Sequence, residues 1–332
     1  MHTAREGATA TLLKNGKVLI AGGDAYQDTG WTFYASAELY DPATGKFTNT
    51  GSMTAARAQA TAVLLSDGRV LIAGGNGCAD PKHCRNVDPG AVEELTSADI
   101  YDPATGKFTR TGSMTGVTNN PASVLLPDGK VLIAAFEPGA ELYDPATGEF
   151  TKLGKGGPTD PPNTATVLPD GKVLVTTGDG SPQLYDEASG KLTTISFAPP
   201  PATPYTATLL PNGRVLLFEA GFLETCDPAT ATTADAGFIS PGDQWTYPTA
   251  TLLADGRVLF VGGYDIPAPG AESVSTDIAV LYDPAGGPAR TGTLQVARQG
   301  QTATLLPDGS VLIAGGEDAM FKTLASAELF KP

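Results

Sequence analysis

The sequence predicts an all-β protein, a seven-bladed β-propeller in which four-stranded antiparallel sheets form a ring. Three observations indicate this fold. One hairpin signature recurs seven times, a second strand–turn–strand unit follows several of its copies, and Gly and Pro account for 40 and 27 of the 332 residues. This composition suits many short strands joined by turns and disfavours long helices. The shortest repeats, roughly 42 residues, fall within the range of propeller blades.

The hairpin signature is clearest in Ala303–Gly316, where two runs rich in Thr, Val, Leu and Ile flank Asp308-Gly309. Such a dipeptide favours the type I′ turn that joins antiparallel strands. Small residues open the first strand, as in Ala8–Thr11, which suits sheets converging on an axis. The second strand is continuously apolar, as in Val70–Ala73, which is typical of a sheet covered on both faces. The other copies turn at Asn15-Gly16, Asp67-Gly68, Asp128-Gly129, Asp170-Gly171, Asn212-Gly213 and Asp255-Gly256.

The second unit, Ala37–Thr48, predicts the two outer strands. Its Asp-Pro-Ala-Thr-Gly core is a turn sequence, because Pro fixes φ, Gly reaches the left-handed region and Asp accepts a local backbone hydrogen bond. Each repeat is therefore four strands, here called a to d. Further copies are Ala98–Thr109, Ala140–Thr151 and, more loosely, Pro182–Thr193. We expect a single domain over 1–332, with blades at approximately 1–53, 54–114, 115–154, 155–196, 197–237, 238–294 and 295–332.

The closing blade is expected to have three strands, because the chain stops within strand c at Ala327–Pro332. Either this blade is naturally short, or a segment upstream of Met1 completes it. An unpaired edge strand invites pairing with another chain. We expect a monomer that retains this possibility of edge pairing at the last blade.

These repeats resemble the kelch-repeat family of β-propellers, including bacterial kelch-like propellers and the central domain of galactose oxidase. Its diglycine after strand b falls on Gly22-Gly23, Gly74-Gly75, Gly262-Gly263 and Gly315-Gly316, and its strand-c aromatic on Tyr40, Tyr101, Tyr143, Tyr185 and Tyr282. Blades three to five lose the diglycine, Cys226 replaces the tyrosine in blade five, and Phe47, Phe108, Phe150 and Leu192 replace the usual strand-d tryptophan. The resemblance implies the fold but no function, because both enzymes and binding modules share this architecture.

The charge balance argues against nucleic acid and membrane surfaces as partners. The chain carries 36 acidic and 21 basic residues, a net charge of −15, which repels phosphate backbones and anionic lipid. No apolar run approaches the roughly 20 residues that span a bilayer, so no membrane insertion is expected. No secretory signal is visible at Met1.

The cysteines indicate a cellular compartment. Cys78 and Cys84 are close in one loop and form a candidate disulfide, which would place the protein outside the cell or at its surface. Free thiols and a zinc site with Asp80 and His83 are the alternatives, although the spacing matches no standard zinc pattern. Cys226 is expected to fill a core position.

The loops predict where a site would lie. Strand alternation sends the uniform a–b and c–d turns to one face and the variable b–c and d–a loops to the other. The insertions at Asp24–Ser36, Asn76–Ser97 and Tyr264–Ile278 all fall in the second set. Binding groups commonly lie on such loops of a rigid scaffold. We therefore expect any site on the b–c/d–a face, near the central opening.

Arginines and acidic residues are the charged candidates on that face. Arg5, Arg57 and Arg298 occupy one repeat position in adjacent blades. They either form a basic patch that binds a carboxylate, or brace their own loops by pairing with a carboxylate or a carbonyl. The acidic candidates either hold a hard cation such as Ca²⁺ or are solvated loop residues. They are Asp24, Asp179, Asp265, Glu317 and Asp318.

Aromatic residues form a third group of candidates. Rings beside carboxylates suit a sugar- or peptide-binding surface, because they give a large contact area at low entropic cost. The alternative is that they fold back as small cores beneath the long loops. The residues are Tyr26, Trp31, Phe33, Tyr34, Tyr205, Trp245, Tyr247 and Tyr264.

For function, the leading expectation is a non-catalytic module that binds a protein loop or glycan through this face. The kelch resemblance also includes copper-radical sugar oxidases, which use two Tyr, two His and a Cys–Tyr cross-link, and a sialic-acid epimerase. Only His2 and His83 are present, so that copper set and a Ser-His-Asp triad are hard to assemble, and no cofactor is expected. The alternative is an epimerase- or lyase-like enzyme for sugar acids, using Asp24, Asp179 or Asp265 with Arg57. A structural role within a longer cell-surface protein is a third hypothesis.

Overall fold

The computed structural model describes residues 1–27, 30–116, 120–134, 139–153, 162–177, 182–197, 206–239, 244–266 and 272–332. The all-β prediction is confirmed in this part of the chain. Its regular structure is β-strand, apart from two single-turn 3₁₀ helices, η1 (Pro81–His83) and η2 (Pro89–Ala91). No helix in the described ranges is long and apolar enough to cross a bilayer.

The main architecture is a set of antiparallel sheets in which each strand pairs with the next main strand along the chain. Six sheets have four strands: β1 (Thr9–Leu12), β2 (Val18–Ala21), β5 (Ser36–Asp41) and β6 (Lys46–Ser52); β8 (Thr61–Leu64), β9 (Val70–Ala73), β12 (Ser97–Asp102) and β13 (Lys107–Ser113); β14 (Ala122–Leu125), β15 (Val131–Ala134), β16 (Glu141–Asp144) and β17 (Glu149–Lys152); β18 (Pro162–Val167), β19 (Val173–Thr177), β20 (Gln183–Asp186) and β21 (Lys191–Thr194); β22 (Thr206–Leu209), β23 (Val215–Glu219), β24 (Phe222–Asp227) and β25 (Thr232–Phe238); β27 (Thr249–Leu252), β28 (Val258–Val261), β31 (Ile278–Asp283) and β32 (Gly287–Thr293). A further sheet has three strands, β33 (Thr302–Leu305), β34 (Val311–Ala314) and β35 (Ala327–Phe330).

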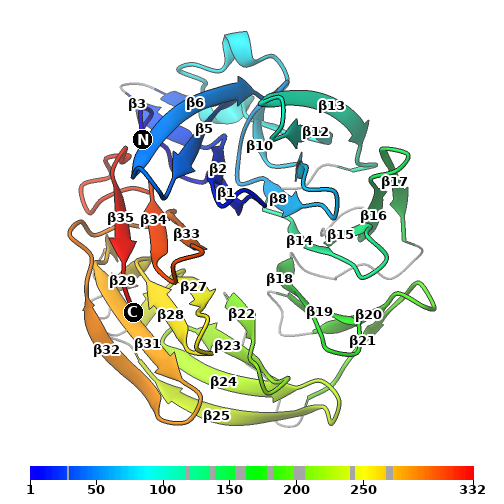
Figure 1. Cartoon of the computed structure of the whole chain (residues 1–332), viewed down its shortest axis with the longest axis vertical. Helices are drawn as coiled ribbons and strands as arrows, with labels where there is room; N and C mark the ends of the chain where they lie inside the picture. Colours follow the sequence, from blue (N-terminus) through cyan, green and yellow to red (C-terminus); the bar gives the residue numbers. More distant parts are fainter. Residues whose placement is uncertain are drawn as a thin grey trace.

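The sheets surround a common centre, and the first strand of each lies innermost (Figure 1). The innermost strands contact one another in the order β1, β8, β14, β18, β22, β27 and β33, and β33 contacts β1. Small side chains such as Ala10 and Ala303 allow this close approach. The arrangement is that of a β-propeller.

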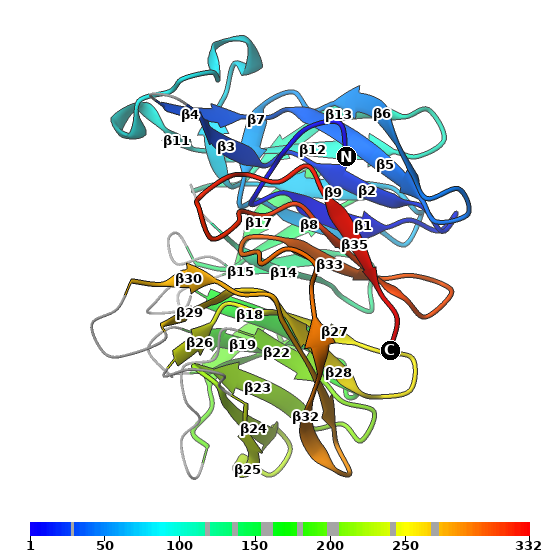
Figure 2. The same ribbon diagram turned by 90° about the vertical axis from the view of Figure 1, so that its left-hand side faces the viewer.

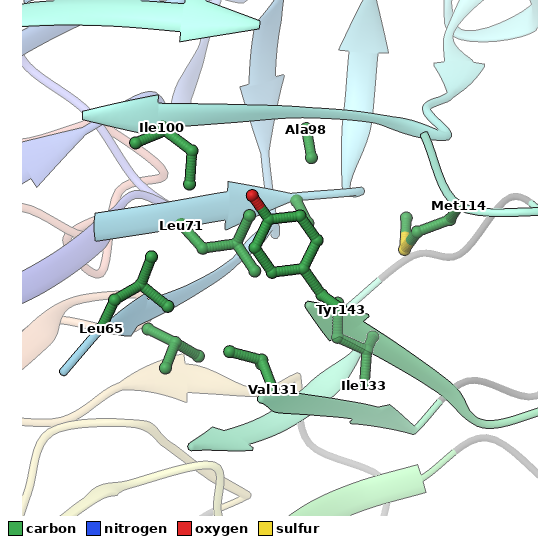
Figure 3. Close-up of a cluster of buried hydrophobic side chains, with 10 residues drawn as sticks. Leu65, Leu71, Ala98, Ile100, Met114, Val131, Ile133 and Tyr143 are labelled. Carbon is green, nitrogen blue, oxygen red and sulfur yellow. The ribbon is translucent and has the colours of Figure 1, made fainter. Parts of the chain in front are cut away.

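The hydrophobic core lies between adjacent sheets, where the apolar second strands pack. Figure 3 shows one such layer, in which Leu71 and Ile100 face Val131, Ile133 and Tyr143 of the next sheet. The Tyr143 hydroxyl lies 2.9 Å from the Thr111 hydroxyl of the preceding sheet, and Tyr101 makes the same contact with Thr50. The strand-c tyrosines therefore join neighbouring sheets both by packing and by hydrogen bonding.

Three small sheets lie on one side of the ring, where the long insertions were expected (Figure 2). They are β3 (Asp24–Gln27) with β4 (Gly30–Phe33); β7 (Ala56–Ala58) with β10 (Asn76–Cys78) and β11 (Glu93–Glu94); and β26 (Gln244–Thr246) with β29 (Tyr264–Ile266) and β30 (Val274–Ser275). The opposite side carries the short turns. There, Asp67 and Asp128 each accept a hydrogen bond from the backbone N–H two residues on, as the turn chemistry predicts.

Candidate functional site

The three predicted arginines are buried and hold their own sheets together. Arg57 is 1% exposed, and its Nη1 donates to the Gly74 carbonyl at 2.7 Å and the Ser97 carbonyl at 2.8 Å. Its Nη2 donates to the Ser97 hydroxyl and lies 3.4 Å from Asp99. We call this set of contacts the clasp. Arg5 makes it with Gly22, Ser36 and Glu38, and Arg298 makes it with Gly315, Ser326 and Glu328.

The sequence left open whether these arginines bind a ligand or brace their own loops. The contacts of the clasp are those of the bracing alternative. Their contacts are with carboxylates and carbonyls of the chain itself, and no more than 1% of each residue is exposed. A Ser-Ala-Glu/Asp sequence occurs in the same three sheets as the arginines and supplies the serine and the carboxylate. That co-occurrence is the signal from which the clasp was predictable.

Trp245 occupies the same repeat position in the sheet of β27 and is also buried. Its indole Nε1 donates to the Gly262 carbonyl at 2.7 Å, which replaces the arginine bond to the first glycine. The ring packs edge-on against Phe218, with 5.5 Å between centroids. Trp245 therefore supports the loop from below instead of presenting a surface to a ligand.

A second contact joins each clasp to the preceding sheet in the ring. The second glycine of a diglycine donates its N–H to the carbonyl of the next sheet's arginine: Gly23 to Arg57 at 2.8 Å, Gly263 to Arg298 at 2.9 Å and Gly316 to Arg5 at 3.0 Å. These hydrogen bonds place the residue that follows each arginine close to the residue that follows the diglycine of the preceding sheet, at the mouth of the ring.

Three carboxyl groups occupy these positions where the sheets of β33 and β1 meet. The backbones of Glu6 and Asp24 exchange hydrogen bonds at 2.9 and 3.0 Å, and those of Gln299 and Glu317 do the same at 2.8 and 3.0 Å. Glu6 also makes a side-chain hydrogen bond with Glu317. Asp24 and Glu317 are 9% and 7% exposed. We call Glu6, Asp24 and Glu317 the carboxyl cluster.

The environment of the cluster favours the protonated forms of Glu6 and Asp24. Burial raises the pKa of Glu6 to about 8, with further contributions from the charges of Glu317 and Asp24 and from the hydrogen bond to Glu317. Burial also raises the pKa of Asp24 to about 7; its own backbone hydrogen bond opposes this shift and the Glu317 charge adds to it. Like charges held close in a poorly solvated site cannot all ionise.

The cluster therefore places Glu6, which its raised pKa keeps protonated at neutral pH, beside the carboxyl group of Glu317. The side-chain hydrogen bond between the two carboxyl groups requires a proton on one of them. The Gln299 amide Nε2 donates to Glu317 Oε1 at 3.3 Å, which orients that carboxylate. Perturbed carboxyl groups of this kind are typical of general acid–base sites.

Sequence reasoning found part of this cluster. Asp24 and Glu317 were predicted from their place after the diglycine, but Glu6 was missed. Its signal was its position directly after a clasp arginine, which matters only once Arg5 is known to point inward. Asp265 lies on β29 opposite Trp245. Asp179 and Tyr205 lie outside the described residues.

The aromatic candidates divide between the two alternatives that the sequence left open. Trp31 packs on the small core formed by Phe33, Cys84 and neighbouring residues, and contacts Tyr26 edge-on at 5.3 Å. Tyr34 lies beneath the Arg5 guanidinium, 5.4 Å from ring centroid to Cζ. Tyr247 stacks on Tyr264 with 5.4 Å between centroids, and Tyr247 is 55% exposed.

The structure joins Cys78 to Cys84 in a disulfide, with 5.8 Å between their Cα atoms. His83 of the same loop is exposed and contacts Asp80 at 2.9 Å. Within the described ranges, no group of three or more His, Cys, Asp or Glu side chains is arranged to hold a metal ion.

The opposite rim carries shallow hollows between its turns. One of about 370 Å³ lies between the turns at Asp170 and Asn212, and similar hollows follow at the next two sheet boundaries. Their recurrence shows that they result from the repeat. They are not a single specialised site.

Comparison with solved structures gives matches along almost the whole chain. A fungal alcohol oxidase of the AA5 family, in complex with copper, matches 99% of this chain and 74% of its own, with a TM-score of 0.74 and 14% identity. YjhT matches 98% of this chain and 95% of its own, with a TM-score of 0.59 and 16% identity. No family model and no curated protein matches. These similarities show a β-propeller fold like that of kelch and galactose-oxidase-like proteins.

The first comparison contradicts the prediction of a non-catalytic recognition module, because this chain shares the fold of an oxidase over 99% of its length. Whether the residues of this chain could bind copper, as the oxidase does, depends on its histidines and cysteines. Copper in proteins prefers imidazole and sulfur ligands. Here His2 Nδ1 contacts Glu38 at 3.1 Å, His83 contacts Asp80 in a distant loop, and Cys226 is buried within the core. The described residues therefore do not fit a copper centre.

Proposed function

We propose that this chain is a seven-bladed β-propeller enzyme that catalyses proton transfer on a neutral sugar, with the carboxyl cluster as its acid and base. The carrying observation is the Glu6–Glu317 hydrogen bond together with the pKa of about 8 for Glu6. The ring of seven innermost strands supports the blade count. The Cys78–Cys84 disulfide supports an extracellular location.

The surroundings favour a neutral substrate over the sugar acids expected from the sequence. A substrate carboxylate needs a cation, and the three clasp arginines are engaged with carboxylates of the chain itself. The net charge of −15 also repels anions. A neutral sugar supplies hydroxyl groups that both donate to and accept from carboxyl groups.

The reaction that suits one acid and one base is the opening and closing of a sugar hemiacetal ring. Protonated Glu6 gives its proton to the ring oxygen while Glu317 takes the proton of the anomeric hydroxyl. The bond between the ring oxygen and the anomeric carbon breaks, and a carbonyl group forms. Closure on the other face of the carbonyl returns both protons and yields the other anomer. No electrons are gained or lost, so the reaction needs no redox partner.

Anomer exchange measures this activity directly. Freshly dissolved neutral aldoses would be followed by polarimetry or by NMR exchange spectroscopy with and without the protein. We expect a faster approach to equilibrium with the wild type, and a rate near the uncatalysed one with Glu6→Gln and with Glu317→Gln. The exposed Glu149→Gln on β17 is the control and retains activity. A wild type that accelerates none of the aldoses, or a Glu6→Gln variant as fast as the wild type, overturns the proposal.

A further inference from the structure

One backbone position at the mouth of the ring adopts a left-handed conformation in five sheets, whereas in the sheet of β18 it holds Pro162, whose ring fixes a negative φ. It is the second residue after the clasp position. Its members and their φ angles are Gly7 (57°), Gln59 (53°), Asn120 (50°), Tyr247 (51°) and Gly300 (62°). Glycine adopts this conformation freely, whereas other residues, and bulky ones most of all, do so at a cost in backbone energy.

Backbone hydrogen bonds connect this position in four of these sheets. The Asn120 N–H donates to the Gln59 carbonyl at 3.0 Å, the Gln59 N–H to the Gly7 carbonyl at 2.8 Å, and the Gly7 N–H to the Gly300 carbonyl at 3.1 Å. These bonds link four neighbouring sheets around the opening. Glycine is therefore the residue that suits the position structurally, and a tyrosine there requires another explanation.

Tyr247 projects a largely exposed ring at this position. Tyr247 is 55% exposed, and its ring lies nearly parallel to that of Tyr264, at an interplanar angle of 26°. Tyr264 is the residue directly after the diglycine, the position that Asp24 and Glu317 occupy in their own sheets. The two rings thus form a supported flat surface at the same mouth as the carboxyl cluster.

The backbone also connects this surface to the cluster. Gly263, which precedes Tyr264, donates its N–H to the Arg298 carbonyl at 2.9 Å. The next residue, Gln299, holds Glu317 through its amide. The tyrosine pair therefore belongs to the sheet that adjoins the cluster in the ring.

We propose that Tyr247, supported by Tyr264, is a stacking platform for the apolar face of a neutral sugar ring bound at the carboxyl cluster. This inference rests on the proposed function and names its specificity-determining residue. The C–H groups on one face of a pyranose complement the electron-rich face of an aromatic ring. Two parallel rings present one flat surface, whereas a cage for an organic cation needs rings at several angles around the charge.

Because of the positive φ at position 247, a glycine substitution can remove the tyrosine ring without destabilising the fold. Tyr247→Gly introduces the residue found at this position in two other sheets. It removes the energetic cost of a positive φ, so we expect an unchanged or higher melting temperature. Tyr247→Phe keeps the ring and serves as the matched control.

Methyl glycosides are suitable probes, because they lack the anomeric hydroxyl and bind without being turned over. Saturation-transfer NMR and calorimetric titration would be run with methyl glucoside, galactoside and mannoside. We expect binding of at least one by the wild type and by Tyr247→Phe, and affinity weakened roughly tenfold or more in Tyr247→Gly.

Each outcome separates the two proposals. Unchanged affinity in Tyr247→Gly overturns the platform, even if Glu6→Gln abolishes anomer exchange. Binding that depends on Tyr247, without anomer exchange by the wild type, supports the platform and rejects the acid–base function. Binding of tetramethylammonium or a methyl uronide in place of the neutral glycosides also overturns the platform.

Discussion

Replacing Glu6 with glutamine is expected to stabilise the protein at alkaline pH. The pKa of Glu6 is about 8 in the folded chain and about 4.5 when exposed. Between these values the unfolded chain releases the proton and the folded chain retains it, so this group's contribution to stability falls as pH rises. At pH 4 both states hold the proton, and the variant gains nothing. A glutamine amide can still donate a hydrogen bond to Glu317.

The size of this effect follows from the shift. A difference of 8 − 4.5 = 3.5 pKa units corresponds to an upper limit of about 5 kcal/mol at pH 8. Glu6 is only partly buried, so solvent screening reduces the expected gain to about 1–2 kcal/mol. A gain of this size from a single substitution is unusual, because most substitutions destabilise.

Thermal and urea unfolding of both proteins at pH 4 and pH 8 measure the effect. The difference in unfolding free energy between Glu6→Gln and wild type should grow from near zero at pH 4 to the expected gain at pH 8. Glu149→Gln, on an exposed strand, should show no such growth. Parallel pH profiles for Glu6→Gln and wild type, or a variant that is less stable at pH 8, would refute the assigned pKa and with it the acid in the proposed mechanism.

Three further predictions concern the clasp, the pH profile and the free cysteine. Arg57→Met should destabilise by about 3–5 kcal/mol in thermal unfolding, because it leaves Asp99 buried without its cation; the exposed Arg69→Met should cost under about 1 kcal/mol. The anomer-exchange rate, measured by NMR, should fall as pH rises through about 8, when Glu6 loses its proton. Cys226 should resist iodoacetamide in the folded protein, as judged by mass spectrometry, because burial raises its pKa to about 12.

The fold was predictable because each repeat carries its own local signals. An Asp-Gly pair, an apolar run and an Asp-Pro turn specify a four-stranded unit without reference to the other units, and seven copies point to a ring. Even exceptions follow this logic: Cys226 stands in the tyrosine position of β24 and is fully buried there. The side on which the insertions lie followed from strand alternation alone.

The site was less predictable because its members come from different repeats. Asp24 and Glu317 are nearly 300 positions apart and meet only because the ring closes. The sequence predicted Arg57 and Trp245 on the variable face but left open whether they point outward or inward. Both side chains point inward because each donates a hydrogen bond to a backbone carbonyl seventeen residues further on, at Gly74 and Gly262. The sequence predicts this partner only if the first glycine of the diglycine is recognised as a hydrogen-bond acceptor.

The clasp also explains why the candidate residues gather where they do. Four consecutive sheets around the ring contain an arginine or tryptophan bonded to the first glycine of a diglycine: Trp245, Arg298, Arg5 and Arg57. The carboxyl cluster and the tyrosine pair each lie one or two residues from such a bond. A catalytic pair must be held to within a fraction of an ångström by groups that do not themselves react. The buried arginines provide that support, so their replacement should reduce kcat through misplaced carboxyl groups even in protein that remains folded.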